Sequence, residues 1–223
     1  MLKQMVKAGC KYAVVETSSE GILQYRHIGL NYHTAVFTNL GMEHSERHGG
    51  FANLKKDKAK IFAKAKTIIA NTDDEHANYF LNFSAPEKYT FGLNPRNRPN
   101  ILGENILSDQ NGTNFSVGAK KFRLNIIGRF NVYNALAAIA VGRSQKISEE
   151  KIAEGLASVK LVEGRMELIN VGQDFKVIVD YAHEPMSLTE LFQSLRHLVG
   201  PDKKIISVIG SDGGGRDKSK REK

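Results

Sequence analysis

The sequence predicts an α/β protein built on a mostly parallel sheet, with a β-hairpin insertion and a second, partial α/β unit. In the first half, apolar runs of strand length alternate with helical patterns, as in strand–helix–strand units with parallel strands. Short β-rich runs over 101–126 are interrupted by Asn111-Gly112, a strong hairpin signal. Near Gly164 the strand-and-helix pattern starts again, so we expect one domain over 1–160 and another over 161–223.

Local patterns predict each element of the first domain. The strand-length apolar runs are 11–16, 33–39 and 67–71, and the helical patterns are 2–9, 51–65 and 74–82. After the hairpin, FNVYNALAAIAVGR (130–143) predicts a buried helix. An amphipathic helix is expected over 148–158, with the Ser148 hydroxyl as its N-terminal cap.

The second domain is expected to begin with two strands, 166–171 and 175–180, around Gly172-Gln173. A helix should follow Pro185, and one more strand should span 203–211. No helical pattern comes after that strand to cover the sheet, so we expect the chain to stop within this domain.

Composition limits the class of protein. With 41% hydrophobic and 25% charged residues, the chain is expected to fold rather than to be disordered. No apolar run approaches the roughly 18 residues that a membrane span needs, and the N-terminus lacks a signal-peptide pattern. The single cysteine, Cys10, excludes an internal disulfide and a cysteine zinc cage. We expect a cytoplasmic protein without a membrane partner.

The net charge of +8 raises the question of nucleic-acid binding. Much of this charge lies in the terminal RDKSKREK and in a basic cluster from Lys55 to Lys66, neither interleaved with aromatic residues, and tryptophan is absent. We therefore expect no nucleic acid as partner, favour anionic small molecules and expect a monomer.

Polar residues follow the expected strand at 11–16. Glu16 and Ser18 would lie at the carboxyl end of a parallel strand, where α/β sheets bind ligands, although a polar turn with capping hydroxyls is an equal alternative. Gln24 and Arg26 follow closely. Arg26 could grip a carboxylate or phosphate, or be an ordinary surface arginine.

The segment TNLGMEHSERHGG (38–50) follows the next expected strand. His44 and His48 are four residues apart, but no third strong ligand has the spacing of a zinc site. Mg²⁺ needs few protein ligands and suits Glu16 and His44. A structural role for histidines in a glycine-rich turn remains the more common alternative.

Lys58 lies on the apolar face of its predicted helix. It is four residues from Leu54, three from Ile61 and four from Phe62, which places it at the centre of the stripe. An unpaired ammonium there is costly, so Lys58 must be paired, deprotonated, covalently modified or extended toward water.

Three later segments also carry candidate residues. Asn131 and Asn134, near a helix start, could read an adenine edge or cap the helix. Arg165 and Asp180 flank the hairpin of the second domain, and His183 follows Asp180 by three residues. The glycines of GSDGGGRDK (210–218) could let backbone N–H groups approach an anion, although such termini are usually mobile.

Together these motifs resemble the Mur ligase family, in particular the branch that adds the third amino acid to the cell-wall precursor peptide. The resemblance covers nearly the whole chain and consists of six motifs in the family's order: ETSSEGILQYR (16–26), TNLGMEHSERHGGFANLKKDKAKIF (38–62), GRFNVYNALAA (128–138), GRME (164–167), DYAHEP (180–185) and GGGRDKSKR (213–221). It implies a central ATPase-type domain and a partial Rossmann-like C-terminal domain.

The resemblance also implies a reaction. ATP would transfer its γ-phosphoryl group to the terminal carboxylate of a UDP-N-acetylmuramoyl peptide, and the amine of an amino acid would attack the acyl phosphate. Two Mg²⁺ sites are implied, with Glu16 and His44 as ligands, and Lys58 matches the lysine that is carbamylated in the family.

The remaining roles that the resemblance implies concern substrate and nucleotide. Ser18, Gln24 and Arg26 match positions that contact the UDP-muramoyl peptide. The positions that match nucleotide-binding or catalytic residues are Asn131, Asn134, Arg165, Asp180, His183 and Lys218.

The chain departs from the family pattern in two substitutions and one absence. Glu43 stands in place of the usual Asp, and Glu20 replaces a common His. The sequence contains no G-x-x-x-x-G-K-[ST] phosphate-binding loop, which in the family precedes the position of Glu16. We therefore expect an incomplete chain that has negligible ligase activity alone. The alternatives are a folylpolyglutamate synthetase-like ligase, which ETSSEGILQYR and DYAHEP disfavour, and a non-catalytic nucleotide-binding remnant.

Overall fold

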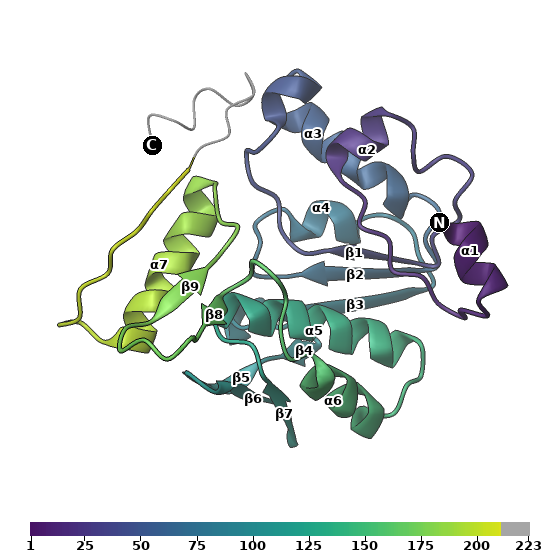
Figure 1. Ribbon diagram of the computed structural model, residues 1–223. Coiled ribbons are helices and arrows are strands. Elements are labelled where there is room, and N and C mark those ends of the chain that lie inside the picture. Colours follow the sequence, from purple (N-terminus) through teal and green to yellow (C-terminus); the bar gives the residue numbers. More distant parts are fainter. Residues whose placement is uncertain (211–223) are drawn as a thin grey trace.

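A computed structural model describes residues 1–210 of the chain. At its centre is a four-stranded parallel sheet in the order β1-β2-β3-β4, which confirms the α/β fold with a parallel sheet (Figure 1). The strands are β1 (Thr34–Phe37), β2 (Thr67–Asn71), β3 (Glu87–Gly92) and β4 (Ile101–Leu102).

Strand β2 is buried along its whole length because both faces of the sheet are covered. Ile68 and Ala70 face one hydrophobic cluster, and Ile69 between them faces the other. This explains why TIIAN is a continuous apolar run instead of an alternating one.

Helices form a layer on each face of the sheet (Figure 1). On one face lie α2 (Ser19–Leu23), α3 (Phe51–Lys58), the 3₁₀ turn η2 (Ala59–Phe62) and α4 (Ala77–Leu81), and on the other lie α5 (Arg129–Ser144) and α6 (Glu149–Ser158). Phe80 of α4 anchors the first layer, with its ring stacked 4.0 Å from that of Phe37. The Ser148 hydroxyl caps α6 as expected, since it accepts from the N–H of Lys151 at 3.4 Å.

The predicted hairpin forms a separate antiparallel sheet of three strands, β5 (Glu104–Asp109), β6 (Gly112–Val117) and β7 (Lys120–Leu124). Gly112 has φ +133°, and a Cβ there would lie 2.1 Å from the carbonyl oxygen of Leu124. This close approach requires glycine at the turn.

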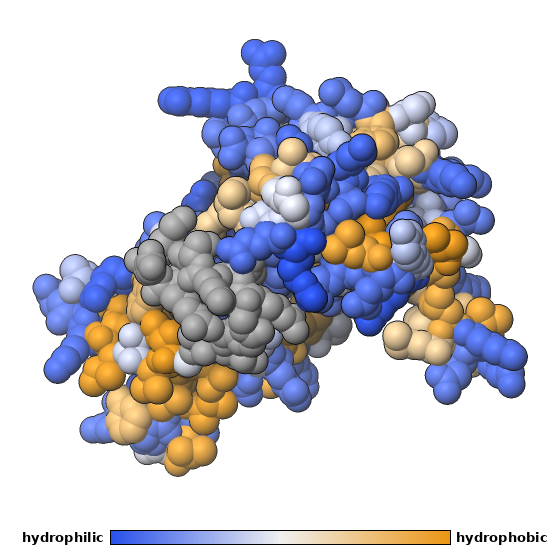
Figure 2. Space-filling view, turned by 90° about the horizontal axis from the view of Figure 1, so that it is seen from above, coloured by the Kyte–Doolittle hydropathy of each residue, from blue (hydrophilic) through white to orange (hydrophobic). Residues whose placement is uncertain are grey.

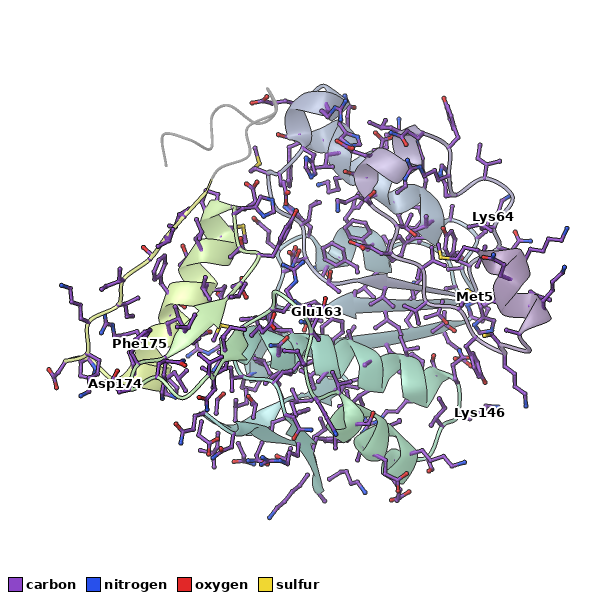
Figure 3. The ribbon with its side chains drawn as sticks, viewed as in Figure 1. Met5, Lys64, Lys146, Glu163, Asp174 and Phe175 are labelled. Carbon is purple, nitrogen blue, oxygen red and sulfur yellow. The ribbon has the colours of Figure 1, made fainter. Side chains whose placement is uncertain are left out.

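The second unit consists of the strand pair β8 (Glu167–Ile169) and β9 (Val177–Val179), followed by α7 (Pro185–Val199). Glu184 and Ser187 form a capping box that starts α7. Asp174 and Phe175, in the turn between β8 and β9, lie on the outer side of the molecule (Figure 3). The opposite end of the hairpin therefore faces the parallel sheet.

Two expected strands do not form. The segment 11–16 has extended but unpaired backbone with Val14 96% exposed, and the described part of 203–211 has no strand, with Val208 98% exposed. Both predictions were wrong because an apolar run becomes a strand only when a neighbouring strand supplies hydrogen bonds, and β1 pairs only with β2 among the described residues. Figure 2 shows hydrophobic side chains gathered over the second unit.

The strand expected at 67–71 forms with the same bounds as β2, and the remaining expected elements form with shifted ends, including α1 (Leu2–Lys7). The sequence patterns did not predict β3, and β4 lies within the predicted β-rich range 101–126 but joins the parallel sheet instead of the hairpin. No helix within the described residues is long and apolar enough to cross a membrane.

Candidate active site

The carboxyl ends of β1 and β2 point toward the side on which α7, β8 and β9 lie (Figure 1). The loops that follow these two strands are joined by hydrogen bonds. Asn71 Nδ2 donates to the carbonyl oxygen of Thr38 at 2.9 Å, and the Leu40 N–H donates to Asp74 Oδ2 at 2.8 Å. The loop that carries Glu43 and His44 therefore starts from a fixed point at the edge where parallel sheets bind ligands.

Lys58 ends α3 beneath this loop and is partly buried. Burial lowers the pKa of its amine, and the carboxylates of Glu43 and Glu16 act in the opposite direction. Its neighbours Leu54 and Phe62 on the apolar stripe are buried, as predicted. The structure thus places Lys58 in a partly buried position, where the charges of Glu43 and Glu16 offset part of the effect of burial.

His44 lies next to this group. It has the left-handed φ of 62°, and its Nε2 is 3.1 Å from Glu43 Oε1. Glu16 and Glu43 supply hard oxygen donors and His44 an imidazole, and Mg²⁺ prefers the oxygen donors. The roles of Glu16 and His44 as Mg²⁺ ligands stay predictions.

Glu43 also contacts the second unit. Its Oε1 lies 3.5 Å from His183 Nε2, which in turn is 3.7 Å from Glu184 Oε1. The ligand atoms of these three residues all lie within 4.8 Å of one another. Sequence spacing could not reveal this contact, because Glu43 and His183 lie on different domains.

Asp180 organises the start of the second unit. Its Oδ2 accepts from the N–H of Met166 and its Oδ1 from that of Ala182, each at 2.8 Å. The Arg165 guanidinium lies over the ring of Tyr181, 4.9 Å from its centre. Asp180 thus holds the GRME turn against the end of β9, with Arg165 exposed beside it.

The residues expected to contact the peptide substrate are local to α2. Ser18 Oγ accepts from the Gly21 N–H at 3.1 Å, so it caps this helix. Gln24 and Arg26 are exposed near the end of the same helix. Their substrate contacts stay predictions.

Asn131 is buried at the start of α5, where its Nδ2 donates to the Ile127 carbonyl at 2.8 Å and its Oδ1 accepts from Asn134 at 3.1 Å. Its amide therefore already stabilises the helix start, and the exposed Asn134 is the better placed of the two to meet a ligand. A cavity of about 260 Å³ near this helix start is lined by residues that include Gly128, Arg129 and Met166. It lies between the GRFNVYN and GRME motifs.

The sequence patterns missed one polar centre beside the site. Asp73, just after β2, accepts from the Leu93 N–H at 2.6 Å and from the Tyr133 hydroxyl at 2.9 Å. Asp73 thus ties the ends of β2 and β3 to α5. Lys218, the remaining candidate, lies outside the described residues.

Comparison with known proteins gives two family matches: residues 1–142 match the Mur ligase middle domain, and residues 164–223 match the Mur ligase glutamate ligase domain. Our expected division at residue 160 falls between them and stays a prediction.

Two curated relatives are each 36% identical over 99% of this chain and 47% of their own length. They are UDP-N-acetylmuramoyl-L-alanyl-D-glutamate--2,6-diaminopimelate ligase of Bacillus licheniformis and UDP-N-acetylmuramyl-tripeptide synthetase of Roseiflexus sp.. A solved structure of a UDP-N-acetylmuramoyl-L-alanyl-D-glutamate--2,6-diaminopimelate ligase superposes with a TM-score of 0.73 and 26% identity, over 89% of this chain and 42% of the other. The chain spans about half the length of the relatives it matches.

Proposed function

The chain belongs to the Mur ligase family, and from that premise we propose that it provides the lysine and metal ligands of an ATP-dependent, ADP-forming ligase. This ligase joins an amino acid to a UDP-N-acetylmuramoyl peptide in the cytoplasm during peptidoglycan precursor synthesis, and acts as a monomer. The proposal rests mainly on the position of Lys58 at the carboxyl edge of the parallel sheet. Its amine is partly buried and feels the charges of the Glu43 and Glu16 carboxylates.

The donor set supports Mg²⁺ as the metal. Glu16 and His44 would hold it, and Lys58 would offer a further oxygen ligand once its amine is carbamylated. Carbamylation forms a bond between Nζ and the carbon of CO₂ and releases one proton, and only the neutral amine reacts. Burial lowers the pKa of Lys58 and so favours the reactive form. Bound Mg²⁺ supplies charge neutralisation for the phosphates of ATP.

The chain's own residues orient the reactants. Ser18, Gln24 and Arg26 bind the UDP-muramoyl peptide, so that its terminal carboxylate receives the γ-phosphoryl group of ATP. The amine of the amino acid then attacks the acyl phosphate, and phosphate leaves as the amide forms. Catalysis of this kind depends mainly on positioning and on neutralising charge.

The nucleotide lies between the two units. The residues proposed to line it are Asn131, Asn134, Arg165, Asp180, His183 and Lys218. The cavity lined by Gly128, Arg129 and Met166 lies next in sequence to Asn131 and Arg165, and this proximity supports a nucleotide between the two units.

A chimeric ligase tests the function. In the Bacillus licheniformis ligase, the matched segment is replaced by this chain, and phosphate release is followed with UDP-muramoyl dipeptide, diaminopimelate and ATP. We expect turnover that falls by about 10²-fold or more in Lys58→Met, because a charge-stabilising group is lost. Lys56→Met, on the exposed side of the same helix, should leave turnover unchanged.

A folded chimera in which both variants release phosphate at the same rate would contradict the proposal. The 223-residue chain alone should release no phosphate, because it contains no phosphate-binding loop motif. The second candidate is a nucleotide-binding protein without turnover, which predicts a chimera that binds Mg·ATP but forms no amide. Turnover with a folate substrate instead of the muramoyl peptide would favour the folylpolyglutamate synthetase-like alternative.

A further inference from the structure

A buried hydrogen bond joins the loop of Glu43 and His44 to the helix that ends in Lys58. His48 Nδ1 lies 2.6 Å from Asp57 Oδ2. The His48 side chain is 0% exposed and that of Asp57 is 15% exposed. A contact this well shielded from water persists in solution better than a surface ion pair.

Both partners are close in sequence to residues of the candidate site. His48 ends the 3₁₀ turn η1 (Ser45–His48), which begins directly after His44. Asp57 directly precedes Lys58 on α3. The pair therefore crosses from one half of the site to the other, and a shift of either partner would move a site residue with it.

The surroundings of the His48 ring show that its hydrogen bond to Asp57 fixes the orientation of the ring. The other ring nitrogen, His48 Nε2, is buried and has no hydrogen-bond partner among the described residues. The contact with Asp57 is thus what orients the ring, as carboxylates commonly do for histidines near metal sites.

Lys60 supports the charge of Asp57, with its Nζ 2.6 Å from Oδ1. The two oxygens of Asp57 therefore have separate partners, Oδ1 facing Lys60 and Oδ2 facing His48.

We propose that His48 and Asp57 are positioning residues, which set the loop of Glu43 and His44 against Lys58 without touching metal or substrate. This inference rests on the proposed function, because it concerns the same site. Outer residues of this kind typically change metal affinity by 10–100-fold when they are removed.

The experiment compares three variants of the 223-residue protein in bicarbonate buffer. Asp57→Ala removes the acceptor. Asp57→Asn keeps an oxygen that accepts from Nδ1–H. Lys60→Met removes the neighbouring charge and keeps the His48 contact, so it is the matched control. The readouts are Mn²⁺ affinity by electron paramagnetic resonance and amide exchange over residues 43–58, with thermal unfolding to confirm that each variant is folded.

We expect Asp57→Ala to weaken Mn²⁺ binding by about tenfold or more and to speed amide exchange in the loop. Asp57→Asn should stay near the parent in both readouts, and Lys60→Met should equal the parent. The inference is overturned if folded Asp57→Ala keeps the parent's Mn²⁺ affinity, or if Asp57→Asn weakens binding as much as Asp57→Ala, since the lost negative charge would then explain the effect.

Failure of the proposed function gives a different result. A parent protein that binds no Mn²⁺ would contradict the metal site itself. The positioning role of His48 and Asp57 is then tested by amide exchange alone. Unchanged amide exchange of the loop in Asp57→Ala would overturn that role.

Discussion

Replacing Tyr133 by Phe tests the hydrogen bond that joins α5 to the loop after β2. This loop lies at the edge of the candidate site. The Tyr133 hydroxyl donates to Asp73 Oδ2 at 2.9 Å, and Phe keeps the ring while removing this bond. A hydrogen bond to a charged group contributes about 1.5–3 kcal/mol. Tyr133 is half-buried and Asp73 keeps the Leu93 N–H as a donor, so we expect the low end, a loss of about 1.5 kcal/mol.

For a domain of this size, that loss lowers the midpoint of thermal unfolding by roughly 3–6 °C. The assay is urea unfolding at neutral pH, with the m-value required to stay constant. Asp73→Asn and the double variant complete a thermodynamic cycle, in which we expect a coupling of about 1 kcal/mol. A coupling free energy within about 0.3 kcal/mol of zero would refute a stabilising interaction between Tyr133 and Asp73.

The contact between Tyr133 and Asp73 also predicts how the free energy of unfolding depends on pH. Burial, followed by the hydrogen bond and charge of Asp73, raises the pKa of the Tyr133 phenol above its ordinary value of 10.0. A group whose pKa is raised by folding stabilises the protein fully below its unfolded pKa and loses that effect as the pH rises through its folded pKa. The difference in unfolding free energy between the parent and Tyr133→Phe should therefore be constant up to about pH 10 and shrink above it.

Two further predictions concern packing. Gly112→Ala should cost about 1–3 kcal/mol in urea unfolding, because its Cβ would meet the Leu124 carbonyl at 2.1 Å; an unaffected midpoint would mean that the hairpin turn is not as described. Phe80→Ala should cost about 3–5 kcal/mol, since the fully buried ring fills the layer between α3 and the sheet; a loss under about 1 kcal/mol would place the ring outside the core.

Local sequence patterns predicted the elements that local packing decides. The run TIIAN predicted β2, and the periodicity around Leu54 and Phe62 placed Lys58 on a buried stripe, where the structure has it. The segment 11–16 has an equally apolar pattern but no strand beside it, so the strand predicted from the pattern alone does not form. Strand formation depends on hydrogen bonds from distant residues, which a short window does not contain.

The contacts that organise the site could not be predicted from the sequence either, because they also join residues that are distant in the chain or depend on how a turn folds. Asp73 and Tyr133 are 60 residues apart and on no common motif. Glu43 and His183 meet only because the carboxyl ends of the parallel strands face the second unit. The sequence places His48 in a glycine-rich turn, but its hydrogen bond to Asp57 depends on how that turn folds onto α3.

The most direct test of the proposed site is whether Lys58 takes up CO₂. The 223-residue protein is equilibrated with ¹³C-labelled bicarbonate and Mg²⁺, and carbon NMR is recorded alongside Lys58→Met and Lys56→Met. We predict one carbamate signal that is present in the parent and in Lys56→Met and absent from Lys58→Met. A spectrum without that signal in the folded parent, or a signal that survives Lys58→Met, would contradict the assignment of Lys58 as the carbamylated metal ligand.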